Sequence, residues 1–357
     1  MSVRMSQRAI CTLVVLFTAC RISPVRAADP SMHPLPSQAF GDWLAACDNL
    51  GDCAVYGFGS GDGAATMIVS LPRGAPPAMT VVLQPNAERP SAVRLQNSHR
   101  GPAVTISLNA SGPDILQGTL RGTLSAGEVA ALLPTLRPAG RLILSQPPLR
   151  AGGRAAILGT IRLAGAAPAL DWVAARQRTL PEMPSFPASL PLFDGSRPDP
   201  RHLPRAVTML PAVRACQRED AGDASASDGS DGAGGTGVTV WRLGPSVALW
   251  SIPCGSGNFD RETLFVLAGP HATAATASFT TLMQMAPHPP GMLVNAETAP
   301  DGRDITATAP DRGLGDCGDY RSYRWDGTRF RLVLARLMTV CRGLAVEDWP
   351  IVYRGQK

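Results

Sequence analysis

The cysteines are the residues of this chain with the clearest chemical potential. Two of them, Cys47 and Cys53, lie six positions apart in the stretch FGDWLAACDNLGDCAVYGF, residues 40–58. Thiols this close could bind a metal, exchange electrons or form a structural disulfide. The spacing matches neither the C-x₂-C pair of zinc sites nor the C-x-x-C of thioredoxin-like enzymes, and the histidines do not cluster near cysteines at ligand spacing. We therefore interpret the pair as a disulfide, and expect neither a metal nor another cofactor.

The N-terminus indicates the compartment in which such a disulfide would form. Arg4 and Arg8 precede an apolar run of 11 residues, 10–20, which is too short to span a bilayer but typical of a signal-peptide core. Small residues before position 28 predict cleavage after Ala27. Lipidation at Cys20 is the alternative, although Phe17 stands where a lipobox normally has Leu. We predict a periplasmic protein with no membrane span.

Removing the leader would also remove most of the net charge. The chain has 33 Lys+Arg against 28 Asp+Glu, but four of the arginines lie within residues 1–27, which leaves 29 against 28. A nearly neutral protein has no overall field to attract phosphates. Nucleic acid is therefore not an expected partner.

A proline-rich segment predicts the organisation of the remaining 330 residues. Residues 181–205 contain repeated prolines, which remove backbone donors and fix φ, so neither a helix nor a central strand should cross them. We predict an N-terminal α+β domain at 38–180, this linker, and a β-rich C-terminal domain at 206–357. A Gly/Asp-rich stretch near 220–237 lacks the calcium-loop spacing of an EF-hand and is predicted to be a disordered loop.

Short β-branched segments predict mostly antiparallel sheets with a few short helices. The predicted fold class is α+β, with two disulfide-stapled domains. Ser125 and Glu128 form a capping-box pattern, which predicts a helix start, and further helices are predicted at 166–178 and 206–217. Asp326-Gly327 predicts a type I′ hairpin turn within 320–334, in which Phe330, Leu332 and Leu334 would share the apolar face. The predicted strands are 66–71, 78–83, 103–108, 141–145, 154–163, 238–243, 247–252 and 263–267.

Beyond the leader, the even number of cysteines favours a disulfide framework. The six cysteines could pair in 15 ways, and the sequence alone does not choose among them. Locality within the predicted domains favours the three pairs Cys47–Cys53, Cys216–Cys254 and Cys317–Cys341.

Two groups of motifs resemble a known family. The first is W-x₃-C-x₅-C, formed by Trp43, Cys47 and Cys53, and the second is the block RGLGDCGDYRSYRWDGTRFRL…CRG…WP…YR at 312–354. Together they resemble the bacterial domain-of-unknown-function family numbered 1176, over essentially the whole mature chain. The resemblance implies an exported, cysteine-bearing envelope protein and supplies no catalytic residues. The first motif by itself is also similar to that of invasion-associated locus B proteins.

The most unusual motif, Gly315-Asp316-Cys317-Gly318, has a functional and a structural interpretation. Arg312 and Asp316, followed by Arg321 and Arg324, could form a recognition site. The motif could instead be a glycine-containing turn in which Cys317 is disulfide-bonded and Asp316 caps local N–H groups.

The sequence contains no G-x-S-x-G motif, Walker loop or dinucleotide fingerprint. We therefore favour a non-enzymatic module that binds an envelope protein or glycan. A carboxylate-dependent hydrolase of envelope material and a thiol oxidoreductase are the alternatives.

Overall fold

The computed structural model describes most of the chain after residue 36. The described residues are 37–60, 64–84, 90–99, 103–110, 119–148, 153–179, 202–223, 237–256, 260–269, 273–282, 285 and 289–355. The predicted signal peptide, Cys20, nearly all of the proline-rich linker and most of the Gly/Asp-rich loop lie outside them. Those assignments, and the domain boundaries based on them, stay predictions.

The first sheet contains strands from the N-terminal part of the chain. Its strands are β1 (Gln38–Phe40), β2 (Trp43–Cys47), β3 (Cys53–Ser60), β4 (Ala64–Leu71), β5 (Ala78–Gln84), β6 (Ala92–Asn97), β7 (Val104–Ser107), β8 (Asn109–Ala110), β9 (Leu120–Thr123), β10 (Arg141–Gln146) and β11 (Ala156–Arg162). Nine of them are ordered β7-β6-β10-β11-β3-β4-β5-β9-β8, and off this path β2 pairs with β1 and β3. Because β7 and β8 are separated only by Leu108, one stretch of chain pairs with β6 and then with β9, and the sheet closes on itself.

The side chains on one face of this sheet form the main core. Alternate positions of β3, β4 and β5, including Val55, Met67 and Val81, are fully buried there. The same core contains residues of helices α1 (Ala126–Leu132) and α2 (Ala166–Thr179). Ser125 and Glu128 make the predicted capping box at the start of α1.

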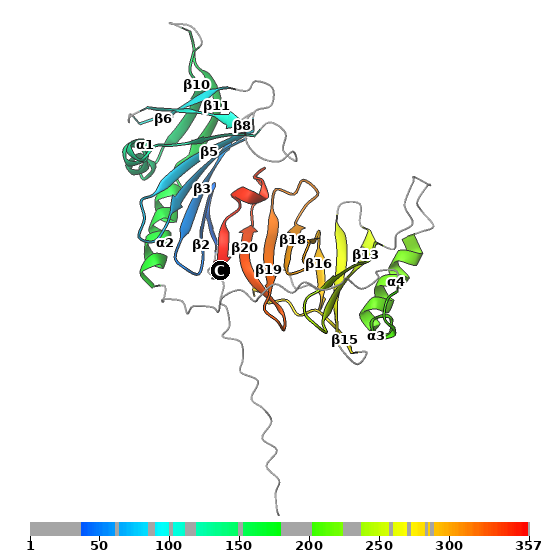
Figure 1. Ribbon diagram of the computed structural model, residues 1–357. Coiled ribbons are helices and arrows are strands. Elements are labelled where there is room, and N and C mark those ends of the chain that lie inside the picture. Colours follow the sequence, from blue (N-terminus) through cyan, green and yellow to red (C-terminus); the bar gives the residue numbers. More distant parts are fainter. Residues whose placement is uncertain are drawn as a thin grey trace, which may run out of the picture. The chain divides into compact units, whose positions relative to one another are not determined.

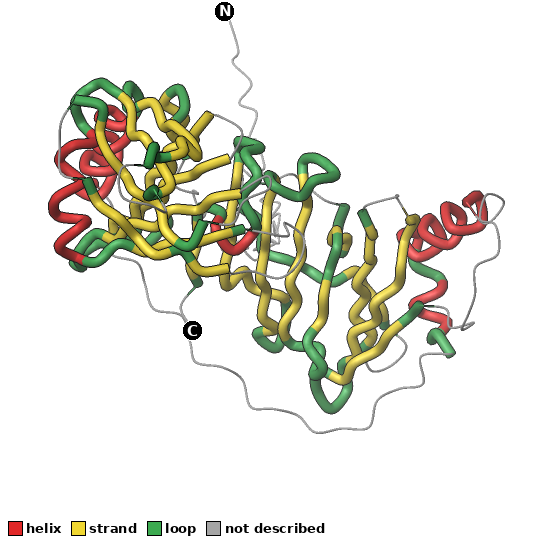
Figure 2. The backbone as a smooth tube through the Cα atoms, turned by 90° about the horizontal axis from the view of Figure 1, so that it is seen from above, coloured by secondary structure: helices red, strands yellow, loops and turns green. Residues whose placement is uncertain are grey.

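Two smaller sheets follow. The second sheet contains β12 (Thr239–Arg242), β13 (Ala248–Ser256), β14 (Arg261–Ala268), β15 (Ala274–Thr276) and β16 (Met292–Val294). The third contains β17 (Glu297–Thr298), β18 (Asp304–Pro310), β19 (Gly318–Trp325), β20 (Phe330–Met338) and β21 (Ile351–Arg354). All pairings between these strands are antiparallel, and the longer helices lie to the outside of the sheets (Figure 2). The predicted fold class is confirmed.

Three disulfides occur in the pairs that locality favours. Cys47 is joined to Cys53, Cys216 to Cys254 and Cys317 to Cys341. The first joins facing residues of β2 and β3, the second joins α4 (Pro211–Asp223) to β13, and the third joins the residue before β19 to the segment after β20. Trp43 is buried in the same core cluster as Cys47 and Cys53.

Two local predictions differ from the structure. The single helix predicted at 206–217 is two helices, α3 (Arg205–Thr208) and α4, because Pro211 begins a new helix and cannot continue the preceding one. In addition, α4 continues to Asp223, since no proline follows to end it near Gln217.

The predicted hairpin is also different in detail. Trp325 pairs with Phe330, so four residues rather than two connect β19 to β20. A bulge at Val333 then shifts the alternation, and Leu334 is half-buried while Ala335 is fully buried. The Asp326 carboxylate accepts hydrogen bonds from the N–H groups of Thr328 and Arg329, which stabilises the longer turn.

The outer face of the first sheet packs against the C-terminal segment. Leu44, Tyr56 and Ile68 share a buried cluster with Met338 and Trp349. In Figure 1 the last strands, coloured red, lie beside the first strands, coloured blue. The other members of this cluster are Phe58, Val82, Cys317 and Leu344.

Candidate binding cleft

The turn between β2 and β3 is organised by one carboxylate. Asp48 Oδ1 accepts hydrogen bonds from the N–H groups of Leu50, at 2.9 Å, and Asp52, at 3.0 Å. Gly51 has a φ of 89°, a backbone conformation that residues with a Cβ rarely adopt. The DNLGD sequence thus forms a closed turn between the two disulfide-bonded cysteines.

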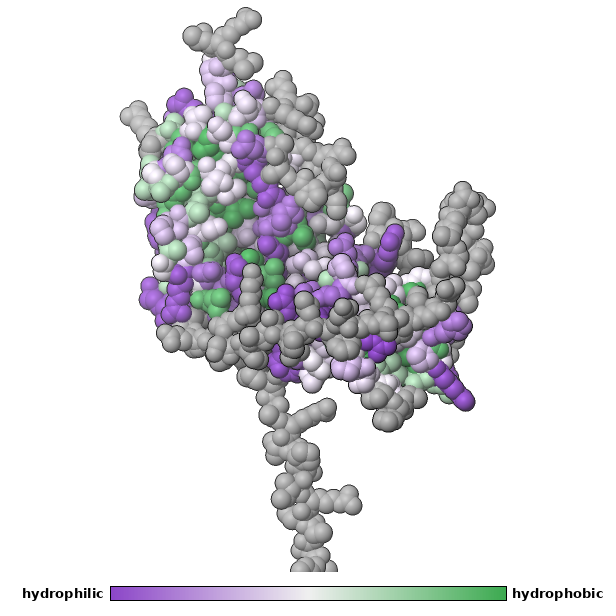
Figure 3. Space-filling model, viewed as in Figure 1, coloured by the Kyte–Doolittle hydropathy of each residue, from purple (hydrophilic) through white to green (hydrophobic). Residues whose placement is uncertain are grey.

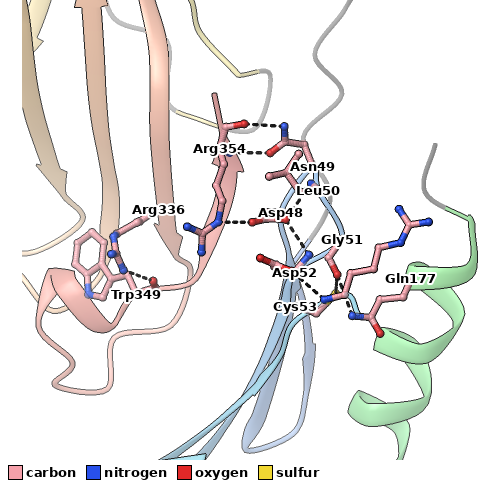
Figure 4. A network of polar contacts seen from close by, with 11 residues as sticks. Asp48, Asn49, Leu50, Gly51, Asp52, Cys53, Gln177, Arg336, Trp349 and Arg354 are labelled. Carbon is pink, nitrogen blue, oxygen red and sulfur yellow. Dashed lines mark hydrogen bonds and ion pairs between the residues drawn. The ribbon is translucent and has the colours of Figure 1, made fainter. Parts of the chain in front are cut away.

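This turn also contacts the last strand of the protein. Arg354 Nε donates to Asp48 Oδ2 at 2.6 Å, and the Asn49 side chain exchanges two hydrogen bonds with the Arg354 backbone, at 2.7 and 2.9 Å. From the opposite side, Gln177 of α2 donates to the Gly51 carbonyl at 2.9 Å (Figure 4). Burial raises the pKa of Asp48, against the opposing effects of Arg354 and the two backbone N–H groups.

A cleft of about 470 Å³ lies next to this turn. A cross-strand row on the outer face of the first sheet, Tyr56, Ile68, Thr80 and Thr123, contributes side chains to its lining. Successive side chains of a strand point to opposite faces of the sheet. These four residues therefore face the cleft, while their neighbours in the same strands face the core. The other lining residues are Asp48, Asp52, Cys53, Ala54, Ser70, Pro72, Arg121, Arg336, Glu347, Asp348, Trp349, Ile351 and Arg354.

One side of the cleft carries a compact charge cluster. Arg121 donates to Asp348 Oδ1 at 2.8 Å and to Glu347 Oε1 at 3.1 Å, and both acids lie in the short helix η3 (Val346–Asp348). The side chain of Asp348 is 9% exposed. Burial raises the pKa of Asp348 to about 6, a shift that Glu347 reinforces and Arg121 opposes.

The hydrogen-bond partners of Arg336 differ from those of Arg121. Its NH1 group donates to the backbone carbonyls of Glu347, at 2.7 Å, and Trp349, at 3.0 Å. Burial lowers the pKa of Arg336, and the nearby positive charge of Arg354 lowers it further. The hydroxyl of Tyr56, whose pKa is raised by burial, is close enough to interact electrostatically with this guanidinium.

On the face shown in Figure 3, hydrophilic and hydrophobic residues are interspersed rather than segregated.

The structure brings together only two of the four predicted recognition residues. Arg312 makes a bidentate contact with Asp316, at 2.6 and 2.5 Å, and Asp316 also accepts from the Gly343 N–H at 2.6 Å. Burial alone would raise the pKa of Asp316, but Arg312 and the Gly343 N–H hold it below its ordinary value. The capping interaction therefore reaches a segment 27 residues away, which the predicted local cap does not include.

The other two predicted recognition residues lie on opposite faces of β19. Arg321 is buried and pairs with Asp319 at 2.6 Å, whereas Arg324 is exposed and pairs with Asp304 at 2.7 Å. Each of these arginines contacts a carboxylate of this chain. A recognition role for Arg312, Asp316, Arg321 and Arg324 stays a prediction.

Three potential metal ligands lie within reach of one another at the same motif. Within the described part of the chain, Asp316, Cys317 and Cys341 have ligand atoms within 4.8 Å of one another. However, the two sulfurs form a disulfide and the carboxylate is held by Arg312, so this donor set does not fit a metal ion.

The comparisons with known proteins place the chain in a family. A family model described as "Protein of unknown function (DUF1176)" matches residues 37–356. The chain belongs to the DUF1176 family. A search of curated proteins found no match for this DUF1176 protein.

A solved structure is similar to part of the DUF1176 chain. It is the crystal structure of invasion associated protein B from Bartonella henselae, with 19% sequence identity and a TM-score of 0.30. The alignment covers 40% of this chain and 99% of that one. None of the helices in the described residues has the length and apolarity needed to cross a membrane.

Sequence reasoning did not identify the cleft. Arg121 lies in an ordinary strand with no motif around it, and Arg336 and Asp348 lie within the span of the 312–354 block but are not among its motif residues. The only available signal is a polar residue at the outward position of an otherwise apolar strand, as Thr80 is in β5.

Proposed function

We propose that this protein is an exported, non-enzymatic accessory module of the cell envelope, and that the cleft is the site where it binds its partner. Three features support the proposal. Six cysteines joined in three disulfides are typical of proteins in oxidising compartments. A volume of about 470 Å³ lies within the range of ligand pockets. The lining combines charged groups with hydroxyls, which suits recognition of a polar group of an envelope protein or glycan.

The observation that carries the proposal is the position of the cleft. Its lining comes from β3, β4, β5 and β9 on one side and from β20, η3 and β21 on the other. The hydrogen bonds between Asn49 and Arg354 hold these two parts together at one end. The site is therefore built on strands with fixed partners, as a preorganised binding site requires.

A cleft-filling variant tests the proposal. Thr123 is exposed on β9 and lines the cleft, so Thr123→Trp would occupy the space while leaving the core intact. Thr105→Trp is the matched control, since Thr105 is exposed on β7 and does not line the cleft. Immobilised wild type and Thr105→Trp should retain the same molecule from envelope extract, and Thr123→Trp should retain at least tenfold less. The absence of a reproducible partner, or equal retention by both variants, would refute the proposal.

One observation favours a carboxylate-dependent hydrolase as the second candidate. Asp348, with a pKa of about 6 beside Glu347, has a property that general acids share. Against this role, Arg121 holds the Asp348 carboxylate at 2.7–2.8 Å. Hydrolysis of a glycan, peptide or ester substrate that is lost in Asp348→Asn would establish this candidate over the first.

A further inference from the structure

The three arginines of the cleft differ in their partners. Arg121 contacts the carboxylates of Asp348 and Glu347, and Arg354 contacts that of Asp48. For Arg336, the hydrogen bonds found in the described part of the chain go to two backbone carbonyls. A carbonyl oxygen has only a partial charge, so this guanidinium has no direct counter-charge among the described residues.

The surroundings of Arg336 disfavour a charged guanidinium that has no direct counter-charge. Arg336 is half-buried, and burial disfavours its charged form. The positive charge of Arg354 also lowers the pKa of Arg336, whereas Tyr56, Tyr320 and Asp348, which is itself paired with Arg121, act in the opposite direction. An anion placed against Arg336 would supply the missing counter-charge and reduce the repulsion between the two arginines.

The lining also offers donors for the oxygens of such an anion. The guanidinium presents a planar fork of N–H groups that matches carboxylate and phosphate geometry. Tyr56, Thr80 and Thr123 provide hydroxyl groups along the same cross-strand row. Tyr56 is protonated at neutral pH, and burial raises its pKa further above the ordinary value of 10.0.

The acidic residues of the cleft limit the total negative charge of the ligand. Asp52 and Glu347 also line it, so the cleft as a whole is not strongly positive and would repel a polyanion. The volume of about 470 Å³ suits a small polar molecule with one anionic group.

We propose that the cleft binds a small polar ligand through a carboxylate or phosphate group that pairs with Arg336. This inference rests on the proposed function, because it names the ligand chemistry of the same cleft. A uronic acid, a short peptide with a free carboxyl terminus and a sugar phosphate all carry this group.

Calorimetric titration with defined probes tests the ligand chemistry. The probes are glucuronate, dialanine and glucose 6-phosphate, with glucose as the uncharged control. At least one charged probe should bind the wild type tenfold or more tightly than glucose does. The ranking of the three probes separates a carboxylate from a phosphate source. If none of the charged probes binds more tightly than glucose, the inference is wrong.

Substitution of Arg336 tests the role of this residue. Arg336→Met removes the charge but keeps much of the side-chain length, and should weaken the charged probe at least tenfold with no effect on glucose. Arg336→Lys, which keeps the charge and loses the fork, should fall between it and the wild type. Arg324→Met is the control, since Arg324 pairs with Asp304 and does not line the cleft. Unchanged probe affinity in Arg336→Met contradicts the inference.

Two further comparisons cover the case in which a variant fails to fold or one experiment is negative. If Arg336→Met does not fold, Arg336→Lys and the cleft-filling Thr123→Trp test the inference instead. The inference then requires both of these variants to bind the charged probe more weakly than Thr105→Trp does. If envelope extract yields a partner that depends on the cleft while charged probes do not bind, the inference fails and the proposed function stands. If neither experiment shows binding, both fail.

Discussion

At the scale of single residues, Asp48 connects two parts of the chain that are distant in sequence. One of its oxygens organises the turn after β2, and the other accepts from Arg354, 306 residues later. An asparagine at this position could still accept the hydrogen bonds of the turn. It could not accept the hydrogen bond from Arg354, because its NH₂ group would face the guanidinium donor.

We therefore expect Asp48→Asn to lower the free energy of unfolding by about 1–3 kcal/mol, since it leaves Arg354 without its acceptor. Urea denaturation measures this change. Asp171→Asn is the control, because Asp171 forms an exposed pair with Arg137 and such pairs contribute about 0–1 kcal/mol. Equal effects of the two substitutions would show that the Asp48 contact is not important for stability.

Asp348 predicts a dependence of stability on pH. Its pKa of about 6 in the folded protein lies above the ordinary value of 3.8, so the folded chain holds a proton that the unfolded chain has released in this interval. The free energy of unfolding should therefore fall as the pH rises from about 4 to about 6, by at most about 3 kcal/mol.

Urea denaturation at several pH values, for the wild type and Asp348→Asn, measures this contribution. The variant should show a smaller fall, because its amide does not titrate. Asp48, whose pKa is also raised, contributes with the same sign in both proteins and cancels in the comparison. Asp316 and Asp326 have lowered pKa values, so their contributions are lost only at pH values below about 4. Parallel pH profiles would contradict this assignment.

At the scale of elements, the start of β19 depends on a glycine. Gly318 has a φ of 130°, and a Cβ at this position would lie 2.2 Å from the Ala309 carbonyl oxygen on β18. The backbone of the neighbouring strand cannot withdraw without breaking its pairing with β19. The GDCG motif thus places glycine where two strands approach closely.

We expect Gly318→Ala to lower the free energy of unfolding by about 2 kcal/mol or more, through this clash and the unfavourable φ. Gly127→Ala in α1 is the matched control, because its Cβ would meet nothing within 4 Å. In a helix this change should raise stability by about 0.5 kcal/mol. Thermal unfolding of both variants provides the measurement. A stabilising effect of Gly318→Ala would contradict the proposed reason for this glycine.

Local elements were predictable to the extent that their signals are local. Short β-branched segments bounded by Gly or Pro identified strands such as β5 and β10, and the Ser125–Glu128 capping box identified the start of α1. The helix at 206–217 was predicted without the break at Pro211, although proline at the first turn of a helix is a known start signal. The bulge at Val333 was not predictable, because its neighbours alternate regularly and the shift is set by pairing with β19.

At the scale of the whole molecule, the cleft depends on pairs that no local pattern reveals. Arg121 meets Asp348 across 227 positions, and Asn49 meets Arg354 across 305. The strand period assigns a residue to a face of a sheet, but it does not identify the segment that will cover that face. The pairing of cysteines was accessible because each pair lies within 38 positions.

The disulfides provide a prediction for the whole protein. In the loop-entropy model, the Cys47–Cys53 bridge contributes about 2.5 kcal/mol and the Cys317–Cys341 bridge about 3.5 kcal/mol. Replacing each pair by serines should lower the free energy of unfolding by these amounts, as urea denaturation can measure. All six thiols of the protein lacking residues 1–27 should resist alkylation until the protein is reduced. A pair that reacts under native conditions would favour the thiol-oxidoreductase alternative.

The contact between the first turn and the last strand has a consequence for the order of folding. Synthesis begins at the N-terminus, so β2–β5 become available long before β21. Until then, Leu44, Tyr56, Phe58, Ile68 and Val82 have no C-terminal segment to cover them. We therefore expect the incomplete chain to be prone to self-association during synthesis, and a holding chaperone to be most needed just before Arg354 is added.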